Sequence, residues 1–309
     1  MKSRQRIVYG RTTGDDARMM PTPGDAPLVR APELAALLGD PALLVVDCRS
    51  DLPRPEWGLA QYRAGHIPGA VFASLDTALS GPITPDSGRH PLPSPAHFAA
   101  TLGGWGFTPD TNVVAYDQGA GIAAARLWWM LRARGHRHVR VLEGGFAAWQ
   151  AAGLPTDTAT PVRTPTTVPP SPFAGVVDAD EVQRGLAART LRLIDARGAD
   201  RFAGENETID PVAGHVAGAR NHPFARNFGP GGLLLDEATL RQSWQRHLQG
   251  VEPSQLAMMC GSGITACYNL LALAALGVEG AKLYAGSYSQ WIRDPNRRVA
   301  TGPETGTEP

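Results

Sequence analysis

The sequence predicts an α/β fold of two tandem domains, each an open, mostly parallel sheet flanked by helices. The chain has 309 residues, which is long for one hydrophobic core and suits two of about 150 residues each. Its two halves repeat similar short segments in the same order. Within each half, short apolar runs alternate with stretches of helical period, and this rhythm is typical of parallel α/β sheets.

The repeat is visible in four segments of each half. The first half contains LLVVDCRS, GHIPGAVF, NVVAYDQGAGIAAARLWWMLRARG and VRVLEGGFAAW, and the second contains LRLIDARG, GHVAGARN, QLAMMCGSGITACYNLLALAALG and AKLYAGSYSQW. The match pairs four landmarks: Asp47 with Asp195, His66 with His215, Asp117 with Cys260, and Trp149 with Trp291. Matches in this order at similar spacing indicate an internal duplication.

Composition predicts the domain boundaries. The Pro- and Thr-rich stretch 156–173 has no hydrophobic period and predicts an extended linker. It separates a first domain at 27–155 from a second at 174–301. The ends, 1–26 and 302–309, are predicted to be disordered extensions.

Each domain is expected to place a loop at the carboxyl edge of its sheet. The runs LLVVD and LRLID, and later VVAY and LAMM, predict buried parallel strands. The segments after Asp117 and Cys260 have helical period and end at Gly135 and Gly277, the usual place for a C-cap glycine. Because ligands bind where the strands of such sheets meet the following helices, Cys260 stands at a predicted functional position.

Composition and charge exclude several classes of function. The formal net charge is zero, so nothing global favours binding to nucleic acid or to a membrane surface. The first residues lack the apolar core of a secretory signal, and no window reaches the roughly 18 apolar residues of a membrane span. Three cysteines are too few for a secreted disulfide framework. These features predict a cytoplasmic protein.

The segment CGSGITA, at 260–266, runs from a predicted strand into a predicted helix. Its glycines let the backbone curl so that several N–H groups converge on one anion, and the helix adds its positive N-terminal end. A thiol in such a cradle ionises more readily than a free one, and the thiolate is the reactive form. Cys260 is therefore the predicted nucleophile. The competing interpretation is a small core cysteine at a strand end.

The chain resembles the two-domain rhodanese family, and CGSGITA resembles the active-site loop of its 3-mercaptopyruvate sulfurtransferase branch. The resemblance rests on this loop, on the paired GHIPGA and GHVAGA segments and on the LLVVD and LRLID starts. It implies a sulfurtransferase with two rhodanese-like domains, of which the second is catalytic. Sulfur would pass from a donor to Cys260 as a persulfide and then to a thiol or cyanide. Asp117 stands where the first copy would need a cysteine, so that loop should be inert.

The resemblance also implies a set of site residues. The catalytic ones would be Cys260, Ser262, Asp76 and His90, with a His90–Asp76 pair oriented toward the Ser262 hydroxyl to relay protons. The substrate would contact the loop through Gly261, Ser262, Gly263, Ile264 and Thr265. The competing interpretation makes Asp76 a helix cap and His90 a surface loop residue.

Arg201 matches a family arginine that contacts the carboxylate of the substrate. A guanidinium suits this role because it binds carboxylates in a bidentate way. The family's second arginine is absent, and Asp210 and Pro211 stand near its expected place. The loop itself carries no fixed positive charge, which disfavours the small dianion thiosulfate as donor and favours 3-mercaptopyruvate.

Two other classes of protein, dinucleotide-binding proteins and cysteine phosphatases, fit parts of the loop pattern. Both loops match the dinucleotide-binding pattern Gly-x-Gly-x-x-Ala, at 119–124 and 261–266, and Glu143 lies near the place of a ribose-binding acid. Neither loop follows the first strand of its unit, and the second copy has Tyr284 near the place of that acid. A cysteine phosphatase would need an arginine to close the loop, and none occurs in the loop or the helix after it.

The remaining cysteines and the repeated histidines are predicted to be structural. Cys48 lacks a glycine cradle, and Cys267 lies about two helical turns past Cys260, with a redox-resolving role as the alternative. His66 and His215 recur in both copies, including the one without a nucleophile. No spacing resembles a metal site, and no cofactor is expected.

Two functions remain open. The first is an enzyme that takes sulfur from a small-molecule donor and gives it to a thiol acceptor, either a small thiol or a thioredoxin-like protein. Thiosulfate in place of 3-mercaptopyruvate is a variant of this function. The second is a non-catalytic persulfide-relay or binding module, for which a partner protein supplies or accepts the sulfur. The intact CGSGITA loop favours the enzyme.

Overall fold

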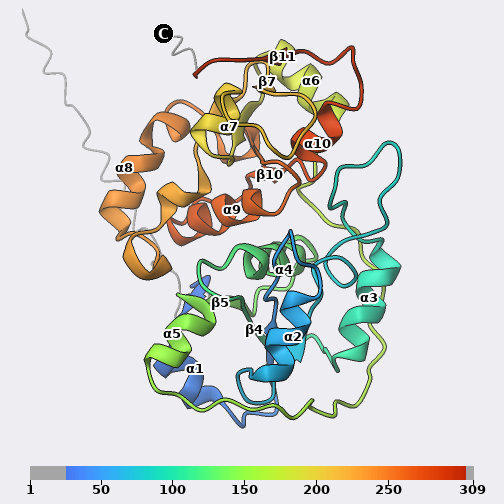
Figure 1. Ribbon diagram of the computed structural model, residues 1–309, viewed down its shortest axis with the longest axis vertical. Coiled ribbons are helices and arrows are strands. Elements are labelled where there is room, and N and C mark those ends of the chain that lie inside the picture. The colour runs from blue at the N-terminus through green and yellow to red at the C-terminus, as the bar shows by residue number, and fades with distance from the viewer. Residues whose placement is uncertain (1–25, 304–309) are drawn as a thin grey trace, which may run out of the picture.

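The computed structural model describes residues 26–303, which form two bodies, one above the other in Figure 1. The predicted extensions at 1–26 and 302–309 lie outside this range, except for residues 26, 302 and 303. The two bodies meet along the helices α4 (Ile122–Ala133) and α9 (Thr265–Ala275), which lie side by side between them.

The N-terminal body is built on a five-stranded sheet in the order β1-β5-β4-β2-β3, in which all neighbours are parallel. Its strands are β1 (Leu28–Val29), β2 (Leu43–Asp47), β3 (Val71–Phe72), β4 (Asn112–Tyr116) and β5 (Val139–Leu142). Besides α4, its helices are α1 (Ala31–Leu37), α2 (Trp57–Ala64), α3 (Pro95–Gly104) and α5 (Gly145–Ala151).

The C-terminal body repeats this plan on a parallel four-stranded sheet in the order β10-β9-β6-β8. Its strands are β6 (Arg192–Asp195), β8 (Arg220–Asn221), β9 (Leu256–Met259) and β10 (Lys282–Leu283), and an antiparallel pair is formed by β7 (His215–Val216) and β11 (Val299–Ala300). Besides α9, its helices are α6 (Ala179–Ala187), α7 (Ala199–Ala203), α8 (Glu237–Leu248) and α10 (Ser287–Trp291), with 3-10 turns η1 (Phe224–Asn227), η2 (Pro230–Gly232) and η3 (Pro253–Gln255). The predicted fold class is confirmed.

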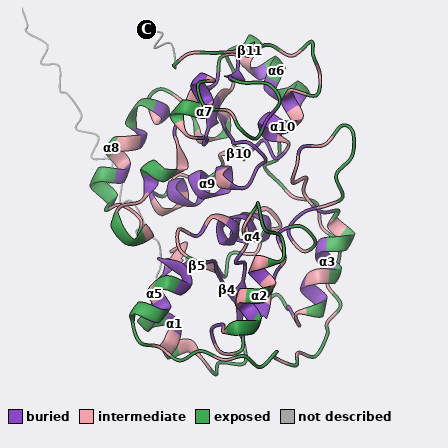
Figure 2. Cartoon of the chain, in the orientation of Figure 1, coloured by how far each residue is buried: buried purple, intermediate pink, exposed green. Residues whose placement is uncertain are grey.

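The central strands and the two interface helices are buried because each is covered on both sides. All residues of β2 and β9 are buried, so these strands need no alternation of polar and apolar side chains. Helices α4 and α9 pack against their own sheet on one side and against each other on the other side. Figure 2 shows both helices as largely buried. The loops that precede these two helices therefore lie close to the contact between the domains.

The predicted linker at 156–173 contains neither a helix nor a strand. It runs along the first domain, where Thr166 N donates to Gly103 O at 2.9 Å and Arg163 Nη2 donates to Leu43 O at 3.0 Å. The boundaries at 27–155 and 174–301 stay predictions.

The repeated histidines pack in the same way in both copies. His66 stacks on Tyr62 with ring centroids 4.0 Å apart, and its Nδ1 lies 2.7 Å from Tyr62 O. His215 stacks on Phe202 at 3.7 Å, and its Nδ1 lies 2.8 Å from Phe202 O. Both rings are buried, so each ties a helix to the segment that follows it. Among the described helices, none has the length and apolar character needed to span a membrane.

Candidate active site

Cys260 lies between the end of β9 and the start of α9, as the sequence predicts. The residue is 2% exposed, and its Sγ accepts a hydrogen bond from Gly263 N at 3.0 Å. Gly263 has a φ of +80°, and a Cβ at this position would lie 2.3 Å from Ala285 O. Only glycine fits there, so the sequence folds this loop into a tight curl around the sulfur.

The segment that begins α10 holds the loop from behind. Tyr288 N donates to Cys260 O and Ser289 N donates to Gly261 O, both at 3.0 Å. Cys260 N donates to Ser287 Oγ at 3.1 Å. These bonds occupy Cys260 N, Cys260 O and Gly261 O, so the start of the loop is held against the first turn of α10.

Two guanidinium groups lie beside Gly261, the residue after the nucleophile. A Cβ on Gly261 would lie 2.9 Å from Arg89 Nη2 and 3.7 Å from Arg201 Nη1. Arg201 is the predicted substrate-binding arginine of the second domain. Arg89 comes from the first domain and was not predicted. Its only signal in the sequence was its position next to His90.

Asp210 lies between these two guanidinium groups. Arg201 Nη2 donates to Asp210 Oδ2 at 3.0 Å, and Arg89 pairs with the same carboxylate through both of its Nη atoms. The Asp210 side chain is fully buried, whereas Arg89 and Arg201 are partly exposed. The carboxylate therefore holds together two cations that would otherwise repel each other.

Glu207 is a second carboxylate partner of Arg201, at 2.9 Å. Burial would raise the pKa of Glu207, but the N–H groups of Asp210 and Ile209, together with Arg201, hold that pKa below its usual value. Glu207 is thus ionised at neutral pH. Arg89 and Arg201 face two carboxylates, so this cluster is close to neutral as a whole.

The predicted catalytic pair is present but loosely coupled. His90 Nε2 lies 3.9 Å from Asp76 Oδ1, which is too long for a hydrogen bond, and Asp76 is exposed. Burial, together with Arg126 and Arg89, lowers the pKa of His90 to about 4, so its imidazole is neutral at pH 7. Within residues 26–303, the Ser262 hydroxyl makes no hydrogen bond, to His90 or to any other group. The structure brings His90 and Asp76 together without a hydrogen-bonded path to Ser262.

The other two cysteines are buried thiols, and none of the three forms a disulfide. Burial, with Asp47 and Asp117 nearby, raises the pKa of Cys48 well above its usual value. Burial also raises the pKa of Cys267 to about 12, and its Sγ donates to Gly263 O at 3.3 Å. Both thiols are therefore protonated near neutral pH and fill space in the core.

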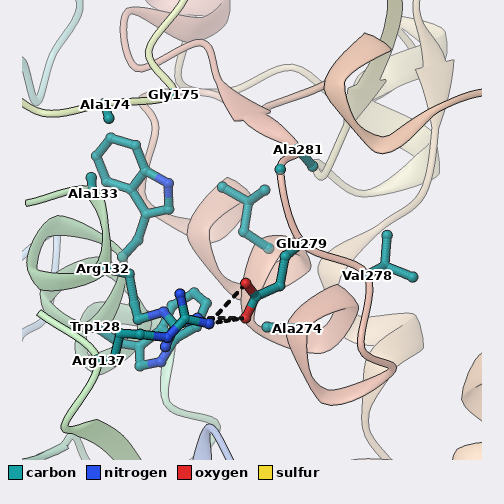
Figure 3. A pocket seen from close by; sticks show the side chains of 13 residues that line it. Trp128, Arg132, Ala133, Arg137, Ala174, Gly175, Ala274, Val278, Glu279 and Ala281 are labelled. Atoms are coloured by element: carbon teal, nitrogen blue, oxygen red, sulfur yellow. Dashed lines mark hydrogen bonds and ion pairs between the residues drawn. The ribbon is translucent and has the colours of Figure 1, made fainter. Parts of the chain in front are cut away.

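Figure 3 shows a pocket lined by residues of both domains. Cys260 is not among the residues that line it. Glu279 lies beside it and accepts hydrogen bonds from Arg132 at 2.5 Å and from Arg137 at 3.0 Å. The other walls of the pocket come from α4, from α9 and from the segments 174–175 and 278–281, whereas Cys260 precedes the amino end of α9. The pocket belongs to the domain interface and not to the thiol site.

Comparison with known proteins identifies the family of the chain. The family model for the rhodanese-like domain matches the chain twice, over residues 30–152 and 178–294. The chain is 46% identical over 280 residues to a Pseudomonas aeruginosa protein named "Probable 3-mercaptopyruvate sulfurtransferase", covering 90% of this chain and 99% of that relative. It is 33% identical over 276 residues to the thiosulfate sulfurtransferase of Cricetulus griseus, covering 85% of this chain and 90% of that relative.

A solved structure shares both the fold and the domain arrangement. The 3-mercaptopyruvate sulfurtransferase from Leishmania major matches with a TM-score of 0.76 at 33% identity, covering 87% of this chain and 74% of that chain. The repeated family match agrees with the duplication found in the sequence and in the two sheets. The chain therefore belongs to the rhodanese family of sulfurtransferases and carries two rhodanese-like domains.

Proposed function

We propose that this protein moves sulfur from 3-mercaptopyruvate to a thiol acceptor through a persulfide on Cys260. The observation that carries the proposal is a cradled thiol with two guanidinium groups beside it. Cys260 Sγ accepts a hydrogen bond from the loop, and Arg89 and Arg201 lie next to Gly261. A thiol that accepts a hydrogen bond from its own loop, with two guanidinium groups beside the next residue, supports sulfur transfer from a donor that carries a carboxylate.

The chemistry proceeds in two displacement steps. The Cys260 thiolate attacks the sulfur of 3-mercaptopyruvate, the carbon–sulfur bond breaks, and its electron pair leaves with the carbon as the enolate of pyruvate. The enolate takes up a proton, and the cysteine retains the sulfur as a persulfide. An acceptor thiolate then attacks the outer sulfur and regenerates the Cys260 thiolate. Neither step needs an external oxidant or reductant.

The donor's carboxylate is proposed to lie against Arg89 and Arg201. Asp210 accepts from both Nη atoms of Arg89 and from Nη2 of Arg201, and Glu207 accepts from the Nε–Nη2 edge of Arg201, which supports the fit of both groups to a carboxylate. Arg201 Nη1 makes no hydrogen bond within the described part of the chain, and it lies on the Gly261 side. Arg89 thereby takes the place of the second arginine that the sequence lacks.

The rest of the loop completes the proposed site. Gly261, Gly263, Ile264 and Thr265 supply its backbone, and the Ser262 hydroxyl has no internal partner and is available to the donor. The proposed proton relay uses the neutral imidazole of His90, and Asp76 Oδ1 lies 3.9 Å from its Nε2. Because its pKa is lowered to about 4, this imidazole is a weak proton acceptor.

The acceptor is proposed to be a small thiol or a thioredoxin-like protein in the cytoplasm. The three unpaired cysteines support a reducing compartment. Because relatives named for thiosulfate also match the chain, thiosulfate is the second candidate donor.

A steady-state comparison of 3-mercaptopyruvate and thiosulfate, with cyanide as the common acceptor, tests the proposal. We expect a higher kcat/KM for 3-mercaptopyruvate. A preference for thiosulfate would overturn the donor assignment. Turnover with neither donor, combined with acceptance of persulfide from a partner protein, would make the protein a relay module.

A further inference from the structure

Arg126 is a fully buried arginine on α4 of the first domain, 0% exposed, that reaches the Cys260 loop of the second domain. Its Nη1 donates to Gly263 O at 3.0 Å, across the domain boundary. Its Nε donates to Leu79 O at 2.9 Å, and its Nη2 donates to His90 O at 2.8 Å and to Pro91 O at 3.2 Å. All four acceptors are backbone carbonyl groups.

This guanidinium lacks an anionic partner among the described residues. Carbonyl groups satisfy its N–H groups but carry only partial negative charge, so a full positive charge remains buried. Burial lowers the pKa of Arg126, and the groups that oppose this shift are the sulfur atoms of Cys267 and Cys260. Cys267 stays protonated because its own pKa is raised to about 12. Cys260 is the remaining candidate for the counter-charge.

The geometry links the same guanidinium to the cradle of the nucleophile. Gly263 donates its N–H group to Cys260 Sγ at 3.0 Å, while its carbonyl accepts from Arg126 Nη1 at 3.0 Å and from Cys267 Sγ at 3.3 Å. Gly263 is therefore held at both of its backbone polar groups. Arg126 fixes the conformation that turns the N–H group of Gly263 toward the sulfur.

We propose that Arg126 is a positioning residue for Cys260 and supplies the buried positive charge that balances its thiolate and persulfide. The first domain, which lacks a nucleophile of its own, thus contributes a cation to the catalytic loop of the second. Through His90 O and Pro91 O, the same side chain also fixes the segment that carries Arg89. The proposal rests on the proposed function only in taking Cys260 as the nucleophile.

The test is the pH dependence of Cys260 alkylation by iodoacetamide in the full-length protein, with Cys260→Ser as the blank. Iodoacetamide is neutral, so its reaction does not depend on carboxylate binding by Arg89 and Arg201. In Arg126→Gln we expect the pH of half-maximal rate to rise by about one unit or more, because the buried positive charge is gone. Arg126→Lys keeps the charge and should retain most of the wild-type profile.

The matched control is Arg132→Gln, on the same helix but at the pocket of Figure 3, where Arg132 pairs with Glu279 across the domains. It should leave the alkylation profile unchanged. An unchanged profile in Arg126→Gln would overturn the proposal. Equal shifts in the Gln and Lys variants would overturn the charge-balancing role.

Should Arg126→Gln fail to fold, Arg126→Met serves in the same alkylation measurement. Methionine removes the buried positive charge and fills the space with an apolar side chain, a replacement that proteins often tolerate. The same rise in the pH of half-maximal rate is expected, and an unchanged profile would overturn the proposal. The measurement does not involve sulfur transfer, so a protein that fails as a sulfurtransferase could still pass it.

Discussion

The loops after β4 and β9 have the same architecture, but the first begins with a carboxylate, Asp117, and the second with a thiol, Cys260. Each runs from a buried strand into an interface helix, with α4 starting five residues after Asp117 and α9 five residues after Cys260. The Asp117 carboxylate accepts hydrogen bonds from Gly119 N at 3.0 Å, Gly121 N at 2.8 Å and Ala123 N at 3.1 Å. The first loop is thus an anion cradle that its own side chain fills.

The difference between the two side chains indicates that the second loop can accept an additional anionic group at its sulfur. Burial raises the pKa of Asp117, and the N–H groups of Gly121 and Gly119 oppose that shift. A carboxylate cannot carry a sulfane sulfur, and here it already accepts the hydrogen bonds of the first loop. The second loop presents a thiol whose sulfur accepts one hydrogen bond from within the loop. The other N–H groups of this loop remain available to a persulfide.

The largest expected effect tests which of the three thiols acts. Cys260→Ser should abolish sulfur transfer, whereas Cys48→Ser and Cys267→Ser should keep most of it, because burial keeps both of those thiols protonated. Donor-dependent thiocyanate formation measures this. A comparable loss in either of the other variants would show that transfer needs a second cysteine.

The isolated second domain should be the next most impaired. A fragment starting near residue 174 lacks Arg89, Arg126 and His90. It therefore loses one proposed contact of the donor's carboxylate, Arg89, and the buried cation that contacts the Cys260 loop, Arg126. We expect it to fold and to transfer sulfur poorly, which circular dichroism and the thiocyanate assay measure separately. Full activity in a folded fragment would contradict the cross-domain account.

Loss of either guanidinium should weaken donor binding by a moderate factor. Removing a charge-assisted contact should lower kcat/KM for 3-mercaptopyruvate about ten- to a hundredfold in Arg201→Ala or Arg89→Ala, mainly through KM. Arg132→Ala is the control for loss of a cross-domain ion pair, and unfolding curves separate binding from stability. A negligible change in both variants would assign the contact to another cation, with Arg226 and Arg293 as candidates.

The smallest expected effect concerns the first cradle. Asp117→Cys in the Cys260→Ser background places a thiol between the N–H groups of the first loop. We expect no transfer above that background, because neither Arg89 nor Arg201 lies at this loop. The thiocyanate assay decides, with alkylation confirming that the new thiol is accessible. Measurable transfer would mean that a cradle and a thiol are sufficient.

The sequence predicted those parts of the structure that local patterns encode. The fold class, the position of Cys260 between a strand and a helix, and the structural histidines follow from periodicity, glycine placement and the repeat. Arg201 followed from the resemblance to the family. Asp210 was noticed only as a departure from the family pattern, although its carboxylate is what joins the two arginines.

The cross-domain residues could not be predicted from the sequence. Arg89 and Asp210 are 121 positions apart, and Arg126 and Gly263 are 137 positions apart. Such pairs depend on how one folded domain docks against the other, and no local pattern specifies that docking. On the sequence, Arg126 is simply one arginine in an apolar helix.

The most direct test of the central claim is mass spectrometry of the protein after reaction with one equivalent of 3-mercaptopyruvate and no acceptor. We predict that the peptide containing Cys260 gains the mass of one sulfur atom, that pyruvate is released in equal amount, and that Arg126→Gln accumulates less of this persulfide. Added sulfur on Cys267 or Cys48 instead, or pyruvate release without sulfur on Cys260, would contradict the account.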